Sequence, residues 1–240
     1  MRPRVTAVIP VYNEGDSIVE CLDGLVDAIT DPFEILVVYD ALDDTTRPHV
    51  EKYAEDDPRV IPTLNTYGRG PANAIRFGIE HATAPIAVVT MADGSDDPSQ
   101  VDALVRLVER GCAVAAASRY MPGGQQIGAP FLKSTMSRLA GVSLYWLARV
   151  GTHDATSSFK AYDRDFVRDV GVESTAGFEV AIELVAKARR HRRPVAEIPT
   201  IWLERTSGAS NFKLWRWLPR YLRWYLYAFG PGITGKPRIR

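Results

Sequence analysis

The chain has 240 residues, of which 46% are hydrophobic, so it can bury the core of one sizeable α/β domain or of two small ones. Lys plus Arg and Asp plus Glu each number 29, and a formal charge of zero excludes a protein held on nucleic acid by its overall field. Residues 1–10 hold no apolar stretch long enough for a secretory signal, and no apolar run approaches the roughly 18 residues of a membrane span, so we expect neither. With only two cysteines, the composition favours a reducing, cytoplasmic location.

Short β-branched runs alternate with segments of helical period in the first half of the chain. The runs that we predict as strands are 5–10, 34–38, 59–64, 86–90 and 113–117. The segments that we predict as crossover helices are 16–28, 45–55, 71–81 and 98–109. Because several of these strands are almost wholly apolar, the sequence predicts an α/β, Rossmann-like fold whose mostly parallel sheet is flanked by helices. Ligands are expected at the carboxyl ends of the strands.

The pattern changes after Arg119. A loop rich in Gly and Pro at 121–130 precedes predicted helices near 132–149 and 178–191, and a predicted strand runs from 195 to 203. We interpret this half as the acceptor side of the protein. It ends in an aromatic tail, so we divide the chain into a main domain at 1–213 and a tail at 214–240.

Polar residues follow the predicted strands directly. Tyr12 and Glu14 come after the first strand and offer an aromatic face and polar groups to a nucleotide base. Asp40 ends the second strand, where it can accept hydrogen bonds from a base or ribose, although an Asp before a helix is more often a cap. Gly70 precedes a helix that opens at Pro71, so the backbone there either passes close to an anion or makes a plain turn.

The sharpest local feature is MADGSDDP at 91–98, which places Asp93, Asp96 and Asp97 directly after a buried strand. Mg²⁺ takes oxygen ligands, often one or two carboxylates plus the phosphates of its substrate. A nucleotide diphosphate with its metal would fit this segment. Asp96 or Asp97 could instead cap the helix that opens at Pro98, so Asp93 is the carboxylate that we favour as a ligand.

A series of motifs occurs in order along the chain. They are IPVYNE at 9–14, Asp40 in a stretch like DDGSxDxT, ADGS at 92–95, SRY at 118–120, DATSSFKAY at 154–162, GFEVAIEL at 177–184 and ERTSGAS at 204–210. Each motif is weak alone, but their order and spacing over about residues 5 to 213 are specific. Together they resemble the family 2 glycosyltransferases of GT-A fold, most closely the dolichol-phosphate and polyprenyl-phosphate mannose synthases.

The resemblance implies that residues 1–213 form a GT-A domain that transfers a sugar with inversion. The donor would be a nucleotide diphosphate sugar, GDP-mannose or a UDP-hexose, and the acceptor a polyprenyl or dolichyl phosphate, with mannose ahead of glucose. By position, the residues that would hold the nucleotide are Pro10, Tyr12, Glu14, Val38 and Asp40, with Gly70 and Ala92 beside them.

The same resemblance implies a divalent cation, Mg²⁺ or Mn²⁺. Asp93 would bind it, and the further candidate ligands are Ser95, Asp96 and Asp97. Fixed cations would stabilise the charge that grows on the leaving diphosphate. Arg119 and Arg205 take that phosphate-binding role, Lys133 and Arg138 are candidates for the acceptor phosphate, and Lys213 completes the candidate set. The alternative for Lys133 and Arg138 is solvated helix charge.

Several residues depart from the family pattern. Met91 stands where its metal motif usually begins with Asp, and Tyr39 replaces the first Asp of the DDGS stretch. Ser158 replaces a usual Gly. Asn211 stands where the mannose synthases commonly have a phosphate-binding Lys, with Lys213 two residues later. These departures favour a non-catalytic nucleotide-sugar-binding protein as one alternative.

A second alternative keeps the donor but sends the sugar to a soluble saccharide. Such a hydroxyl acceptor would need a general base, for which Asp154 and Glu179 are candidates. A dehydrogenase is disfavoured, because Pro10-Val11-Tyr12-Asn13 stands after the first strand where a G-x-G-x-x-G fingerprint would be needed.

The aromatic tail has the composition of a helix that lies at a membrane surface. Arg216, Arg220 and Arg223 recur at spacings of four and three on one stripe beside several Trp and Tyr residues. These charges and Pro219 exclude a membrane span. The alternatives are a helix packed on the core of the domain, a homodimer contact or a contact with a membrane partner subunit. The tail therefore predicts peripheral attachment to the cytoplasmic face of a membrane as one outcome.

Overall fold

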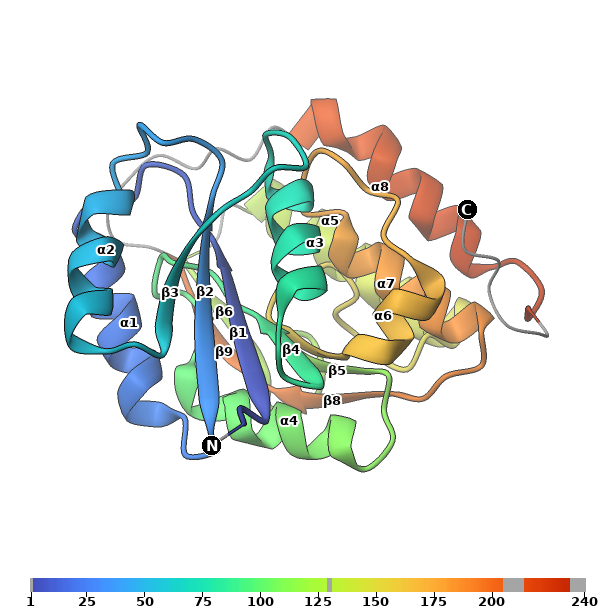
Figure 1. Ribbon diagram of the computed structural model, residues 1–240. Helices are drawn as coiled ribbons and strands as arrows, with labels where there is room; N and C mark the ends of the chain where they lie inside the picture. Colours follow the sequence, from blue (N-terminus) through green and yellow to red (C-terminus); the bar gives the residue numbers. More distant parts are fainter. Residues whose placement is uncertain (1, 129–130, 205–213, 234–240) are drawn as a thin grey trace.

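The computed structural model describes residues 2–128, 131–204 and 214–233, without the side chains of 132–133 and 214–216 (Figure 1). In chain order the elements are β1 (Val5–Pro10), α1 (Ser17–Ala28), β2 (Phe33–Tyr39), α2 (Arg47–Asp56), β3 (Val60–Leu64), α3 (Pro71–His81), β4 (Ile86–Val89), η1 (Pro98–Gln100), α4 (Val101–Glu109), β5 (Val114–Ser118), β6 (Gln125–Ile127), α5 (Phe131–Ser143), η2 (Leu144–Ala148), β7 (Lys160–Asp163), α6 (Arg164–Val170), α7 (Val180–Arg190), β8 (Val195–Pro199), β9 (Ile201–Leu203) and α8 (Leu214–Ala228).

The central sheet has the strand order β3-β2-β1-β4-β7-β5-β8. Its neighbours pair in parallel except at β7, which runs antiparallel to both β4 and β5. All the other strands of this sheet therefore point the same way, as the alternating pattern of the sequence predicts. A second, small sheet pairs β6 with β9 in parallel.

Alternate residues of the strands are buried on the two faces of the sheet, which explains why these strands are apolar throughout. Val8 of β1 packs into one cluster with residues of α3, α7 and α8. Ala7 and Ile9 pack into a second cluster with residues of α1 and α4. Every residue of β1 is buried. The sheet is thus covered by helices on both sides (Figure 1), which is the layered α/β architecture that the sequence predicts.

The second half of the chain departs from the predicted elements in several places. The loop predicted at 121–130 contains the strand β6, and the strand predicted at 195–203 is two strands, β8 and β9, in different sheets. The helix predicted near 132–149 ends in η2, a π-helical segment. Helix α6 was not predicted. The pairings of β6, β7 and β9 are between segments far apart in the sequence, so a local pattern does not reveal them.

Helix α8 packs one face against α7 and leaves the opposite face exposed. Trp224 is buried, and its Nε1 donates to Ser174 Oγ at 3.0 Å. The carboxylate of Glu173 pairs with Arg223 at 2.6 Å. On the outer side, Leu222 and Leu226 are exposed. Among the described residues, no helix is both long enough and apolar enough to cross a bilayer.

The direction of the strands decides where a ligand could bind. The carboxyl ends of β1, β2, β4 and β5 meet at one edge of the sheet, and the loops that follow them carry most of the motif residues. Because β7 is antiparallel, the segment that precedes it, from Asp154 onward, reaches the same edge. Strand β8 ends there as well and leads into β9.

Candidate functional site

The loops after β1 and β2 are tied together at the edge of the sheet. The carboxylate of Asp44, which is buried, accepts hydrogen bonds from the backbone N of Asn13 at 3.2 Å and of Thr46 at 2.8 Å. The backbone N of Glu14 donates to Thr46 Oγ1 at 2.9 Å. This carboxylate therefore holds two loops of the site at once.

Asp40 fixes the loop that leads into α3. One of its carboxylate oxygens accepts from Asn65 Nδ2 and the other from the backbone N of Gly70, both at 2.7 Å. Gly70 has a φ of 122°, and a Cβ there would lie 2.9 Å from the carbonyl oxygen of Ala176. A glycine is therefore required, because any side chain would meet the backbone of the α6–α7 loop.

The remaining residues predicted to hold the nucleotide differ in what they can offer. The side chains of Pro10, Val38 and Ala92 are buried, so a ligand could reach only their backbone. The carbonyl oxygen of Val38 already accepts from Val11 N at 2.9 Å. In contrast, Tyr12 is 61% exposed, so its ring is accessible to a ligand.

The four residues predicted to bind a metal are held in different ways. Asp93 Oδ1 accepts from Ser95 N at 3.2 Å and from Ser95 Oγ at 2.6 Å. Asp97 caps η1 by accepting from Ser99 N at 3.0 Å, which is the alternative that the sequence offered for one of the two neighbouring aspartates. Asp96 turns inward, where its Oδ2 accepts from Thr90 Oγ1 and from Met91 N, both at 3.0 Å.

Asp93 and Asp96 form an acidic pair at the end of β4. Removal from solvent and the neighbouring charge of Asp93 raise the pKa of Asp96 to about 6. The described residues contain no group of three or more acidic, His or Cys side chains arranged to hold a metal ion. Two carboxylates fit a divalent cation that takes its other ligands from the phosphates of a substrate.

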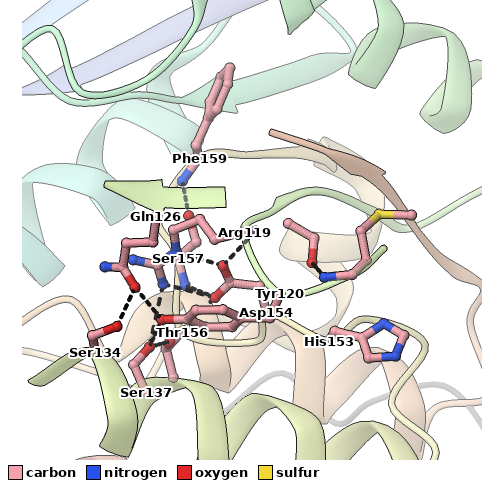
Figure 2. A network of polar contacts seen from close by, with 12 residues as sticks. Arg119, Tyr120, Gln126, Ser134, Ser137, His153, Asp154, Thr156, Ser157 and Phe159 are labelled. Atoms are coloured by element: carbon pink, nitrogen blue, oxygen red, sulfur yellow. Dashed lines mark hydrogen bonds and ion pairs between the residues drawn. The ribbon is translucent and has the colours of Figure 1, made fainter. Parts of the chain in front are cut away.

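Arg119 and Asp154 form an ion pair (Figure 2), and Arg119 is close enough to Asp96 to feel its charge. Arg119 Nε and Nη2 donate to the two carboxylate oxygens at 2.6 and 2.9 Å, and the backbone N of Arg119 donates at 3.1 Å. Burial would raise the pKa of Asp154, but Arg119 outweighs it and lowers the pKa. Asp154 is therefore an anion that orients Arg119, and it is poorly suited to the role of general base.

Hydroxyl and amide groups extend this pair toward α5, as Figure 2 shows. Tyr120 OH donates to Gln126 Oε1 at 3.0 Å and lies 2.9 Å from Ser137 Oγ. Ser134 Oγ donates to the same amide oxygen at 2.9 Å, and Ser137 Oγ lies 2.7 Å from Thr156 Oγ1. Sequence reasoning missed these four members of the network, because Gln126 lies on the unpredicted β6 and the others are common surface residue types.

A cavity of about 700 Å³ opens beside this network. Two cationic side chains, Arg119 and Arg138, line it together with the loop 121–127, and α5 supplies Ser134 and Val142. Because the cavity has two guanidinium groups and several hydroxyl donors, its polar wall suits an anion such as a phosphate.

Two further charged residues, Lys160 and Glu179, are buried. Burial lowers the pKa of Lys160 to about 8, and the neighbouring carboxylates of Asp154, Asp96 and Glu197 work against that effect. Lys160 Nζ donates to the carbonyl oxygen of Ser157. Glu179 is also buried, and its carboxylate accepts from Gly177 N at 2.8 Å. Neither residue lines the cavity.

Three predicted residues lie outside the described set. Arg205 and Lys213 fall in the segment 205–213, and the side chain of Lys133 is not described. Asn211, the departure from the family pattern, lies in the same segment. Of the other predicted residues, the structure brings Asp93, Ser95, Asp96 and Arg119 to the edge where the nucleotide loops meet.

The sequence is similar to that of known sugar-transferring enzymes. The family model described as glycosyl transferase family 2 matches residues 6–171. A polyprenol monophosphomannose synthase of Mycolicibacterium smegmatis is 30% identical over 215 residues, which cover 87% of this chain and 80% of that protein.

Solved structures share the fold at lower identity. Glucosyl-3-phosphoglycerate synthase from Mycobacterium tuberculosis, solved with Mn²⁺, UDP and phosphoglyceric acid, matches with a TM-score of 0.67 and 16% identity, covering 97% of this chain and 81% of that one. A mannosyltransferase from Pyrobaculum calidifontis was solved with GDP-Man and Mn²⁺. It matches with a TM-score of 0.59 and 23% identity, covering 94% of this chain and 63% of that one. The architecture is therefore the GT-A fold.

Proposed function

Because the chain belongs to glycosyltransferase family 2, we propose that it is an inverting mannosyltransferase that uses GDP-mannose and a polyprenyl phosphate acceptor. The observation that carries the proposal is the cavity of about 700 Å³ with Arg119 and Arg138 on its wall, next to the acidic pair at the end of β4. A cationic acceptor cavity beside an acidic metal site matches a reaction in which an anionic acceptor attacks a metal-bound nucleotide sugar.

The donor side of the proposal rests on the loops after β1, β2 and β4. Asp40 and the exposed ring of Tyr12 are available to the nucleoside, and Glu14 stays with them as a candidate contact. Solved structures of the fold hold either GDP-Man or UDP with Mn²⁺, so our choice of GDP-mannose follows the mannose synthases among the sequence relatives. Arg205 and Lys213 remain candidates for the diphosphate, from outside the described residues.

Asp93 and Asp96 would hold a divalent cation, Mn²⁺ or Mg²⁺, and Ser95 keeps Asp93 in place through two hydrogen bonds. When bound, the cation would neutralise the negative charge that grows on the leaving diphosphate. Met91 offers no carboxylate, so the protein supplies fewer ligands than the family pattern does. Asp97 serves as the cap of η1, and we leave it out of the ligand set.

The acceptor side rests on the fixed guanidinium of Arg119. Its two hydrogen bonds to Asp154 hold it in one orientation, so it can meet a phosphate oxygen without reorganisation. Arg138 adds a second positive charge on the α5 wall of the cavity. The pair would orient the acceptor phosphate for attack on the anomeric carbon from the side opposite the leaving diphosphate, which inverts that carbon.

A lipid acceptor also agrees with the surface next to the cavity. Beyond Val142, the α5–η2 segment exposes Trp146 and Leu147 at 68% and 69%. Helix α8 contacts η2, and its Tyr225 OH lies 3.0 Å from Ser143 Oγ. The exposed apolar side chains of α5, η2 and α8 would rest on a membrane surface, with a polyprenyl tail leaving the cavity in the same direction. The enzyme would then act as a peripheral protein on the cytoplasmic face.

The experiment that tests the proposal offers the protein one donor and two acceptors. Purified protein, Mn²⁺ and GDP-mannose are incubated with a short-chain polyprenyl phosphate in detergent or with 3-phosphoglycerate, and the products are identified by mass spectrometry. We expect a mannosyl phospholipid and no mannosyl phosphoglycerate. Transfer to the soluble acceptor alone would replace the proposed acceptor, and metal-dependent donor binding without turnover on either would make the chain a binding protein.

A matched variant separates the metal site from the fold. Asp93→Asn should abolish transfer and the thermal stabilisation by GDP and Mn²⁺ together, because a ligand that binds the native state raises its Tm by mass action. The Tm of the free protein should change little, since the amide oxygen of Asp93→Asn can still accept hydrogen bonds from Ser95. Asp97→Asn keeps an oxygen to cap η1 and should keep activity.

A further inference from the structure

Helix α8 belongs to the tail that the sequence set apart from the main domain, yet its contacts lead to the donor side of the protein. The helix lies across α7 (Figure 1) and also meets the loop between α6 and α7. Within that loop, the segment 173–178 has contacts on two sides. Its outer residues contact α8, and the two residues in the middle, Thr175 and Ala176, contact the start of α3.

The first two residues of this segment are fixed by α7 and α8 together. The buried carboxylate of Glu183, on α7, accepts from the backbone N of Glu173 at 2.6 Å and of Ser174 at 2.8 Å. Lys187 Nζ balances that carboxylate at 2.7 Å. From the other side, Trp224 Nε1 donates to Ser174 Oγ at 3.0 Å. Because buried polar groups are costly to leave unpaired, this end of the segment has little freedom to move.

Trp217, near the start of α8, covers the other end of the segment. A Cβ on Gly177 would lie 2.8 Å from Cδ2 of this indole and 2.6 Å from Oε2 of Glu179, so only a glycine lets the ring lie directly on the backbone. The same Glu179 oxygen accepts from Gly177 N at 2.8 Å. Phe178 meets the indole edge-on, with centroids 6.0 Å apart and planes at 75°. Trp217 thus packs on the two residues that follow Ala176.

The middle of the segment lies against the loop that orients Asp40. Thr175 O accepts from Asn73 Nδ2 at 3.2 Å, and the carbonyl oxygen of Ala176 stands 2.9 Å from where a Cβ of Gly70 would be. Gly70 N in turn donates to the Asp40 carboxylate at 2.7 Å. A glycine has wide conformational freedom, so Gly70 depends on this neighbouring backbone to keep its N–H on Asp40. The position of Ala176 therefore affects the donor side.

We propose that Trp217 is a positioning residue for the donor nucleotide. This inference rests on the donor side of the proposed function and deepens it. The indole keeps the end of the segment in place, the segment keeps Ala176 against Gly70, and Gly70 keeps the carboxylate of Asp40 oriented toward the nucleoside. Trp217 acts through these contacts and not on the substrate itself. Helix α8 thus serves the donor side as well as the proposed membrane contact.

Trp217→Ala, which removes the ring from the backbone of Gly177, tests this role. We expect the Kd for GDP with Mn²⁺, measured by calorimetry, and the KM for GDP-mannose to rise about tenfold, within the usual range for coupling between two sites. The value of kcat should stay within about twofold, because Asp40 would bind the nucleoside equally in the ground state and the transition state. A variant that is merely less folded would lose kcat per mole of protein and keep its KM.

Two variants serve as controls. Trp217→Phe keeps an aromatic ring on Gly177 and should bring the Kd for GDP back to within about threefold of wild type. Val105→Ala removes buried volume from α4, in the core cluster on the other face of the sheet, so it should lower the Tm and leave the Kd unchanged. Wild-type affinity in Trp217→Ala, or an equal loss of affinity in Val105→Ala, would overturn the inference.

Hydrogen exchange in the nucleotide-free protein separates this inference from the proposed function. In Trp217→Ala the amides of residues 68–76 should exchange several-fold faster, because Gly70 N loses its hold on Asp40 and Ala74 N its hold on Gly70 O, while β1 exchanges as in wild type. If wild-type protein neither transfers mannose nor binds GDP but exchange rises at 68–76 alone, the proposed function fails and the positioning role stands. Unchanged exchange at 68–76 overturns the inference, whether or not the wild-type protein transfers mannose.

Discussion

At the scale of single residues, the pairing of Arg119 with Asp154 decides the chemistry of the acceptor side. Sequence reasoning could name both residues, because they belong to recognisable motifs, and it offered Asp154 as a general base. It could not foresee that the two side chains bind each other, because 35 positions separate them along the chain. The buried pair makes Asp154 the residue that orients Arg119 on the cavity wall.

Asp154→Asn should destabilise the protein strongly, because it leaves the guanidinium of Arg119 buried without a counter-charge. We expect the free energy of unfolding, from urea denaturation at pH 7, to fall by about 3 kcal/mol or more. Asp165→Asn is the matched control, since Asp165 pairs with Arg168 on the surface with both side chains more than half exposed. Its effect should stay within about 0.5 kcal/mol. Equal effects of the two variants would contradict the burial argument.

The same pair predicts how stability depends on pH. The pKa of Asp154 lies below its ordinary 3.8 in the folded protein, so the unfolded chain binds this proton first as pH falls. The stabilisation is complete above pH 3.8 and is lost as pH falls through the lower, folded-state pKa. The stability gap between wild type and Asp154→Asn should therefore be constant from pH 7 to pH 5 and shrink below pH 4. A stability gap that widens as pH falls would mean that folding raises the pKa of Asp154 instead of lowering it.

At the scale of elements, the loop between α6 and α7 supports the nucleotide side from behind. The carbonyl oxygen of Ala176 lies against Gly70, and Thr175 O accepts from Asn73 Nδ2 at 3.2 Å. The sequence predicted α3 with its correct bounds, Pro71–His81, because Pro at its start and the apolar spacing are local signals. It could not predict why Gly70 is a glycine, because the contact comes from a distant loop.

Gly70→Ala tests this packing. The new Cβ would lie 2.9 Å from Ala176 O at a residue with φ of 122°, so we expect a loss of about 1–3 kcal/mol in unfolding free energy. Because Gly70 N also donates to Asp40, the affinity for GDP should fall with it. Gly111→Ala is the control: its φ is 102° and nothing lies within 4 Å of its Cβ. If both variants lose the same stability and keep GDP affinity, backbone strain alone explains the glycine.

At the scale of the whole molecule, the two halves differ in how well the sequence predicts them. Strands β1 to β5 and their helices follow one another as local units, so apolar periodicity predicts them within one or two residues at most ends. The acceptor half depends on β7 inserting antiparallel between β4 and β5, and on β6 pairing with β9. The cavity lies in this second half, which is why Gln126 and His153 on its wall were not predicted, whereas Arg119 and Arg138 were named from the sequence.

The apolar surface of the acceptor half predicts membrane binding. Trp146→Gln combined with Leu147→Gln should lower partitioning onto anionic phospholipid vesicles by about tenfold. The reason is that the two substitutions remove apolar surface that the membrane would otherwise take out of water. Sedimentation of vesicles with bound protein measures this directly. Leu42→Gln, at a residue 62% exposed in the loop after β2, is the control and should not change partitioning. Equal partitioning of all three proteins would place the membrane contact elsewhere.

The central claim is that the cavity next to Arg119 receives an anionic lipid phosphate, and the steady-state kinetics of Arg138→Gln test it most directly. The KM for citronellyl phosphate should rise at least tenfold, because a charge-assisted hydrogen bond is worth about 1.5–3 kcal/mol, while the KM for GDP-mannose stays unchanged. Arg106→Gln, on the exposed side of α4, should change neither constant. An unchanged KM for the lipid phosphate in Arg138→Gln would contradict the account.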